Sequence, residues 1–160
     1  MVDGSGDRIA ASQDGASLRC IDCTLDFVID NANTGLSINN GGIVELIGCT
    51  IASSTSGTLE NLVVAGGGNG GGHFYAKGCD FSIVDTQLLA NVGASTVEDG
   101  FDFKIEGCKL HASVNFVEEN LLLNSFDVQI LRSSSASGTA EHQFHYENWR
   151  GVVEDNTTRS

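Results

Sequence analysis

Apolar and polar residues alternate in four stretches of this chain, and each stretch contains Gly or Asp followed by Cys. In the last of them, Phe103 and Ile105 alternate with Lys104 and Glu106. Side chains change face at every residue of a strand, so each stretch predicts a half-buried β-strand that ends in a turn. The stretches cover residues 18–25, 44–51, 74–81 and 103–110, and their cysteines are Cys23, Cys49, Cys79 and Cys108.

The motif returns at a nearly constant interval, because its cysteines are 26, 30 and 29 residues apart. This period indicates a repeat architecture in which each unit buries its apolar face against the next. The four motif cysteines are therefore predicted to form a ladder in the core of a β-solenoid. Two weaker matches, at 126–131 and 144–149, place Leu131 and Trp149 at the Cys position. They bring the expected number of coils to about six.

The motif residues Ile47-Gly48-Cys49-Thr50-Ile51 resemble the coils of the pectate-lyase-like superfamily, in which a strand often ends in Gly-Cys, polar, apolar. The resemblance covers roughly residues 15–152 and implies an all-β fold, a short right-handed parallel β-helix. The chain also resembles small β-solenoid proteins of virus particles. Such folds host many functions, so the resemblance implies no single activity. A β-sandwich or jelly roll is the alternative, because it also has many short strands between Gly-rich turns.

The chain divides into three parts by composition. Residues 1–16 are polar and predict a flexible or partner-bound N-terminal arm. Residues 17–153 form the expected β-solenoid domain, and residues 154–160 form a C-terminal tail. A start that is polar and acidic suggests that the protein carries no secretion signal.

A run of glycines interrupts the middle of the domain. It lacks the Gly-Lys-Ser/Thr of a phosphate-binding loop, and Gly72 stands where a calcium β-roll repeat needs Asp. We interpret it as a possible contact with a partner, with a plain flexible loop as the alternative. The run consists of Gly66, Gly67, Gly68, Asn69, Gly70, Gly71 and Gly72.

Composition restricts the possible partners. The 160 residues include 20 Gly and no Pro, which fits a chain whose amides are needed in strand pairing. The net charge is −13, from 21 acidic and 8 basic residues. Nucleic acids and anionic membranes attract basic surfaces, so we expect neither as a partner.

No chemical site is predicted. Four of the five cysteines recur in one strand context, so we expect free thiols rather than a disulfide framework. Cys20 and Cys23 form an isolated CxxC without a second pair for zinc. The outward charges occupy different motif positions and build no carboxylate pair for glycoside hydrolysis. We therefore expect no catalytic residues, no metal, no cofactor and no enzymatic activity. The outward charges considered are Glu45, Lys77, Asp80, Lys104, Glu106 and Lys109.

These observations favour a structural protein of a virus particle, a capsid decoration (cement) protein that bridges shell subunits. Its expected partners are the major capsid protein or other virion subunits and copies of itself, with a trimer favoured. It would be made in a host cytoplasm and reside in the virion. One alternative is a glycan-binding β-helical segment of a bacteriophage tail spike or fibre, for which Tyr75 is an outward aromatic. Another is a polysaccharide lyase or hydrolase.

Overall fold

The fold was analysed in a computed structural model of the 160-residue chain. It describes residues 9–11, 15–27, 34–38, 41–55, 57–66, 72–92, 101–111, 114–117, 126–135, 150–154 and 157–158. All regular elements within these ranges are β-strands. Accordingly, the described part of the chain contains no helix long and apolar enough to cross a membrane.

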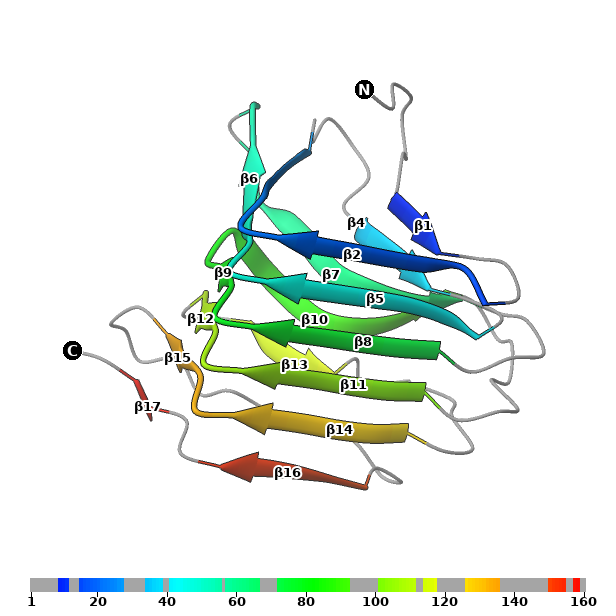
Figure 1. Cartoon of the computed structure of the whole chain (residues 1–160). Coiled ribbons are helices and arrows are strands. Elements are labelled where there is room, and N and C mark those ends of the chain that lie inside the picture. The colour runs from blue at the N-terminus through cyan, green and yellow to red at the C-terminus, as the bar shows by residue number, and fades with distance from the viewer. Residues whose placement is uncertain are drawn as a thin grey trace.

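The strands form three sheets (Figure 1). Sheet A contains β1 (Ile9–Ala11), β4 (Thr34–Ile38), β7 (Leu59–Gly66), β10 (Val84–Val92) and β13 (Asn115–Val117). Sheet B contains β2 (Ser17–Ile21), β5 (Gly42–Ile47), β8 (Gly72–Lys77), β11 (Phe101–Glu106), β14 (Phe126–Leu131) and β16 (Arg150–Glu154). Sheet C contains β3 (Thr24–Phe27), β6 (Thr50–Ser53), β9 (Asp80–Phe81), β12 (Lys109–Leu110), β15 (Ser134–Ser135) and β17 (Thr157–Thr158).

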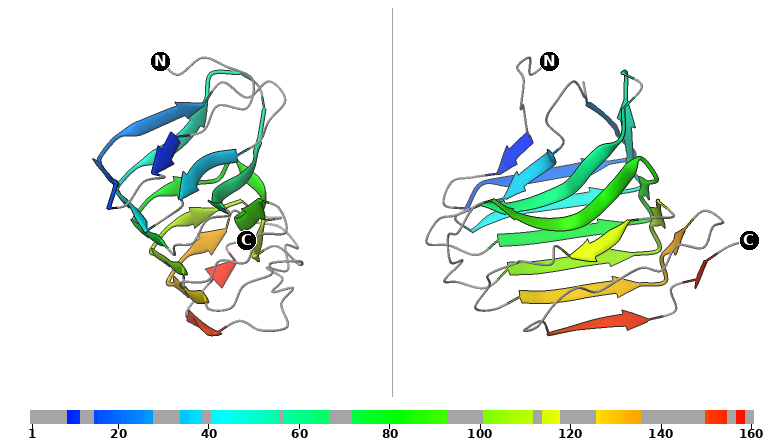
Figure 2. Two further views of the ribbon diagram at one scale, coloured as in Figure 1. Left: turned by 90° about the vertical axis from the view of Figure 1, so that its right-hand side faces the viewer. Right: turned by 180° about the vertical axis from the view of Figure 1, so that it is seen from behind.

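The chain passes from sheet B to sheet C to sheet A and then returns to sheet B one strand further along. Every strand pair between neighbouring coils is parallel, from β2 with β5 to β15 with β17. The views in Figure 2 show the strands stacked along one axis. The protein is thus all-β with parallel sheets, which is consistent with a β-solenoid. Sandwiches and jelly rolls are built from antiparallel strands, so the parallel pairing argues against that alternative.

The register of sheet B confirms the alignment of the first four motifs. Leu18 pairs with Val44, Val44 with Phe74, and Phe74 with Phe103. The fifth alignment is wrong by two residues, because Phe103 pairs with Val128 while Phe126 pairs with Phe101. Consequently Leu131 does not occupy the Cys position. That place belongs to Ser133, which follows Arg132 at the same corner as Cys108 follows Gly107.

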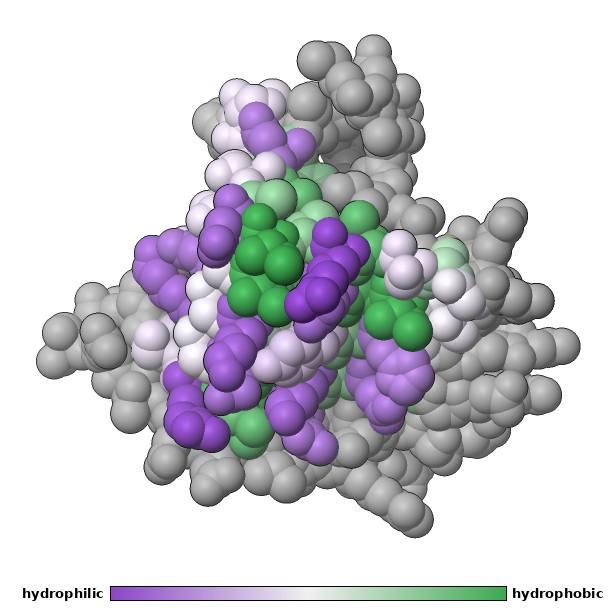
Figure 3. Space-filling model, in the orientation of Figure 1, coloured by the Kyte–Doolittle hydropathy of each residue, from purple (hydrophilic) through white to green (hydrophobic). Residues whose placement is uncertain are grey.

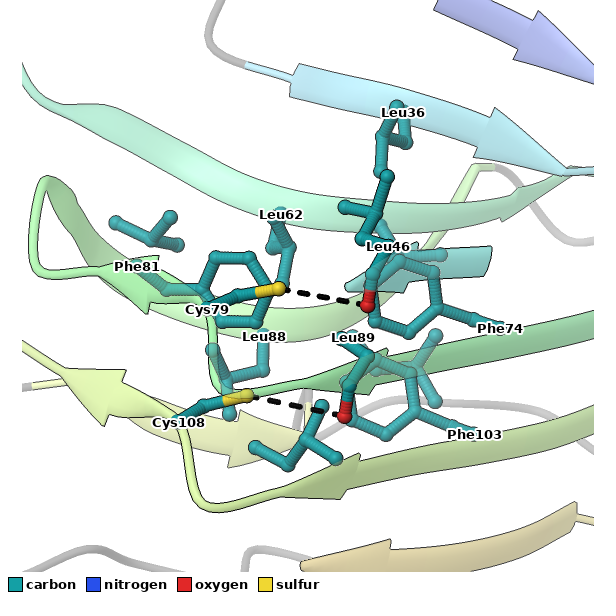
Figure 4. Close-up of a cluster of buried hydrophobic side chains, with 14 of the residues drawn as sticks. Leu36, Leu46, Leu62, Phe74, Cys79, Phe81, Leu88, Leu89, Phe103 and Cys108 are labelled. Carbon is teal, nitrogen blue, oxygen red and sulfur yellow. Dashed lines mark hydrogen bonds between the residues drawn. The ribbon is translucent and has the colours of Figure 1, made fainter. Parts of the chain in front are cut away.

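The core lies between the three sheets and follows from the alternation in the sequence. Val44, Phe74 and Phe103 point inward from successive strands of sheet B and are at most 1% exposed. The rings of Phe74 and Phe103 stack with centroids 5.0 Å apart. Figure 4 shows them packed against leucines of sheet A, including Leu88 and Leu89. Stacking like residues on one another therefore builds one continuous apolar core.

Both ends of the chain contain strands that the division by composition did not predict. Ile9–Ala11, within the expected arm, forms β1 and pairs with β4. Thr157–Thr158, within the expected tail, forms β17 and pairs with β15. The sixth motif match at 144–149, with Trp149, lies outside the described residues; the strand of sheet B that follows it is β16.

Candidate functional site

The corner between sheets B and C repeats in the five coils for which the structure describes it. The residue before the Cys position has a positive φ, at Asp22, Gly48, Gly78, Gly107 and Arg132. Its amide donates a hydrogen bond to the next coil, as from Gly78 N to the Glu106 carbonyl at 2.9 Å. The corner therefore keeps the hydrogen bonding between coils continuous. It also shifts the inward–outward alternation of the side chains by one residue. This explains the Gly or Asp of the sequence motif, because these residues tolerate the left-handed conformation best.

Three of the four predicted ladder cysteines, Cys49, Cys79 and Cys108, are buried just after this corner. The Cys49 amide donates to the Cys79 sulfur at 3.4 Å, and the Cys79 thiol donates to the Leu46 carbonyl at 3.4 Å (Figure 4). In the next coil the Cys108 amide donates to the Ser133 hydroxyl at 3.3 Å. Cys and Ser thus accept the same amide hydrogen bond, and the ladder has a packing role.

The first expected ladder member, Cys23, is instead exposed. It lies between β2 and β3, which are the last strands at one end of their sheets, so no further coil of these sheets covers it. Cys20 is half-buried, and all five cysteines are free. Burial raises the pKa of Cys20, and the nearby thiols of Cys23 and Cys49 add to this effect. A hydrogen bond with Cys79, together with burial, likewise raises the pKa of Cys108. These raised values disfavour reactive thiolates at the two positions.

The outer face of sheet B carries the charged residues that the motifs place opposite the core. Hereafter "the sheet B face" means the outward side chains of β2, β5, β8, β11 and β14. Strand register arranges them in three rows along the stack. The described first row is Ser17, Ile43, His73 and Asp102; the middle row is Arg19, Glu45, Tyr75, Lys104 and Gln129; the third row is Ile21, Ile47, Lys77, Glu106 and Leu131.

A basic and an acidic side chain meet in each row. Arg19 lies 2.8 Å from Glu45 in the middle row, and His73 Nδ1 lies 2.8 Å from Asp102 in the first. In the third row Lys77 Nζ is 3.6 Å from Glu106, which also contacts Arg132 at 3.6 Å. Each pair joins two neighbouring coils, so these charges hold the stack together from outside. Figure 3 shows this face, with polar side chains in purple beside apolar ones in green.

The centre of the sheet B face is Tyr75. The ammonium of Lys104, from the next coil, lies 5.8 Å from the centroid of its ring. A cation at this distance is attracted by the ring face and covers part of it. Tyr75 is therefore an outward aromatic, as the sequence indicates, but one already engaged by a neighbouring coil.

Sheet C repeats the pairing of neighbouring coils. Lys109 Nζ lies 2.9 Å from Asp80 Oδ2, and the Ser82 amide donates to Asp80 Oδ1 at 2.9 Å. Burial acts to raise the pKa of Asp80, but the hydrogen bonds from Ser82 and Lys109 outweigh it and lower the pKa. Asp80 is thus held as a carboxylate by local structural contacts.

The remaining sequence candidates do not assemble into a chemical site. The outward residues Glu45, Asp80 and Glu106 each pair with a base in another coil. Within the described ranges, no three His, Cys, Asp or Glu residues are grouped closely enough to hold a metal ion. Of the glycine run, Gly66 ends β7 and Gly72 begins β8, while residues 67–71 lie outside the described residues.

Comparison of the chain with protein-family models, with curated proteins and with solved structures gives no match.

Proposed function

We propose that this chain is a structural protein of a virus particle, a capsid decoration (cement) protein that bridges and stabilises shell subunits. The observation that carries the proposal is the use of the outward charges. The ion pairs at Arg19–Glu45, Lys77–Glu106 and Lys109–Asp80 each connect adjacent coils. Charges arranged in this way stiffen a stack, whereas an enzyme needs charges that converge on a reacting group.

The direction of the contacts supports a mechanical role. Backbone hydrogen bonds, the buried cysteine contacts and the outer ion pairs all run along the stack, from one coil to the next. Pulling the coils apart must break many of these contacts together. A body of this kind is suited to bridging neighbouring subunits of a shell that is under internal pressure.

The finer description of the fold is also part of this proposal. We infer a closed, right-handed parallel β-helix of about six coils that resembles the pectate-lyase-like superfamily. Its support is the repeated B–C–A strand order and the general right-handedness of parallel crossovers. The expected location is the virion, after synthesis in a host cytoplasm, and the expected partners are the major capsid protein or other virion subunits.

A second candidate is the glycan-binding segment of a bacteriophage tail spike or fibre. It is favoured by Tyr75 at the centre of the outward face of sheet B. It is opposed by Lys104, which lies over the ring that a sugar would stack on. A polysaccharide lyase or hydrolase has less support, because the outward acids Glu45, Glu106 and Asp80 are engaged in pairs between coils.

The test is to delete this protein from the particles of its source and to heat the particles while nucleic-acid release is recorded. The proposal predicts that shells still assemble but burst at a lower temperature, and that adding the purified chain restores the original release temperature. Unchanged release by the deleted particles contradicts a stabilising role. Loss of attachment to host polysaccharide with unchanged heat resistance points to the spike or fibre.

A further inference from the structure

The sheet B face differs in charge from the rest of the chain. It holds three bases, Arg19, Lys77 and Lys104, and three acids, Glu45, Asp102 and Glu106, and Asp127 of β14 is in register with Asp102 at the end of the first row. The whole chain has a net charge of −13. Two copies therefore repel each other least when these faces meet.

The same face carries exposed apolar side chains. Ile21 is 49% exposed and Ile43 is 42% exposed, and they are the exposed large hydrophobic residues within the described ranges. Ile47 and Leu131 on the same face are half-buried. A face with little net charge and several apolar side chains has the composition of a protein interface.

The order of the charges along the rows selects one symmetric arrangement. Consider two sheet B faces in contact, related by a two-fold axis that runs parallel to the strands between β8 and β11. Each residue of β8 then faces the residue of the partner's β11 that occupies the same row. Lys77 meets the partner's Glu106, His73 meets the partner's Asp102, and Tyr75 meets the partner's Lys104.

The outer strands agree with this arrangement. The same axis places β5 opposite the partner's β14, so Ile47 meets the partner's Leu131 and Glu45 meets the partner's Gln129. At these two positions apolar meets apolar, and a carboxylate meets an amide that can donate a hydrogen bond. In the first row Ile43 lies opposite the partner's Asp127, which adds no favourable contact.

A two-fold axis that runs along the stack, in contrast, is unfavourable. Such an axis would place each strand opposite itself and exchange the first row with the third. The carboxylate of Asp102 would then face that of the partner's Glu106, and His73 would face the partner's Lys77 without an acid between them. Placing like charges opposite one another costs binding free energy and excludes wrong orientations.

We propose that two copies of this chain pair face to face through sheet B, about a two-fold axis parallel to the strands between β8 and β11. The contact is isologous, so each opposite-charge contact occurs twice. Glu106 then lies near Lys77 of its own chain and the partner's Lys77. This pairing does not depend on the proposed role in a virus particle, and it replaces the trimer favoured by the sequence with a dimer.

The test uses sedimentation equilibrium of the full chain and two charge reversals, Lys77→Glu and Glu106→Lys. In a dimer of either variant alone, residues 77 and 106 of facing chains carry the same charge. Because of the two-fold symmetry, this repulsive contact occurs twice. We expect the dimer dissociation constant of each to rise by at least roughly tenfold. An equimolar mixture of the two variants restores the dimer, because Glu at 77 of one chain meets Lys at 106 of the other. The ion pair within each chain stays broken in this mixture, so only contact between chains explains the rescue.

A matched control is Lys109→Glu on sheet C. The Lys109 side chain is 54% exposed and paired between coils, like Lys77 at 55%, but it lies off the sheet B face. This variant is expected to leave the dimer unchanged, and circular dichroism verifies that all variants fold. His73→Glu and Asp102→Lys provide a second pair with the same design. A monomeric or trimeric wild-type protein overturns the proposal, and so does a mixture that fails to restore the dimer.

Discussion

Phe103 and Lys104 are neighbours in β11 with opposite environments, so truncating each to Ala tests the register of the stack. Phe103 is 0% exposed and stacks on Phe74 of the previous coil at 5.0 Å. Lys104 points outward over Tyr75. A slip of one residue in register would exchange the two environments, because successive side chains of a strand face opposite ways.

The expected magnitudes differ several-fold. Truncating a buried Phe to Ala costs about 3–5 kcal/mol, from lost burial and from the cavity left behind. The value for Phe103→Ala is expected in the upper half of this range, because the stacked pair with Phe74 adds roughly 0.5–1.5 kcal/mol. Lys104→Ala removes one exposed cation–π contact, which contributes about 0.5–1 kcal/mol. Domains are typically stable by about 5–15 kcal/mol, so the first loss is a large part of the total.

The measurement is urea unfolding of the wild type and both variants, followed by far-ultraviolet circular dichroism. Phe103→Ala is expected to lower the free energy of unfolding by about 4 kcal/mol, and Lys104→Ala by less than about 1 kcal/mol. Equal losses, or a larger loss for Lys104→Ala, would refute both the register of β11 and the position of the core.

Three further predictions concern two glycines, Asp80 and the thiols. Gly78 has φ +62° and open space where a Cβ would lie, so Gly78→Ala is expected to cost about 1–2 kcal/mol in urea unfolding. Gly72→Ala should cost at least about 2 kcal/mol, because its Cβ would lie 2.7 Å from Ile38 Cγ2; a smaller loss than for Gly78→Ala would contradict this packing. Folding lowers the pKa of Asp80 from 3.8, so its contribution is present above that pH and disappears as the pH falls further. Asp80→Asn should therefore flatten the acid dependence of the unfolding free energy, and an unchanged dependence would count against the lowered pKa. With a maleimide reagent and mass spectrometry, Cys23 should react first and the three buried cysteines only on unfolding; early labelling of the buried group would contradict the ladder.

The first four coils could be predicted from the sequence because two signals agree there. The alternation of apolar and polar residues indicates which side chains of each strand point inward, and Gly or Asp before Cys marks the corner. In the fifth coil only alternation remains, since Arg132 and Ser133 replace Gly and Cys. Alternation has period two, so it cannot distinguish Phe126 from Val128 as the partner of Phe103. This ambiguity explains why the predicted alignment of the fifth coil is wrong by two residues.

Only part of the candidate site could be predicted from the sequence. The outward charges were recognised, but the pairs between coils were not. Lys77 and Glu106 both stand directly before the corner glycine of their motifs, so aligning the motifs would have placed them side by side. The strand β1 could not be found in the same way, because its three residues carry no motif.

The central claim is that this chain is a structural component of a virus particle. The most direct measurement is to sediment a lysate of the native source on a density gradient and to quantify the protein in each fraction by mass spectrometry. The account predicts that it travels with large particles at a fixed, substantial ratio to a major shell protein. Recovery of the protein only in the soluble fractions would contradict the account.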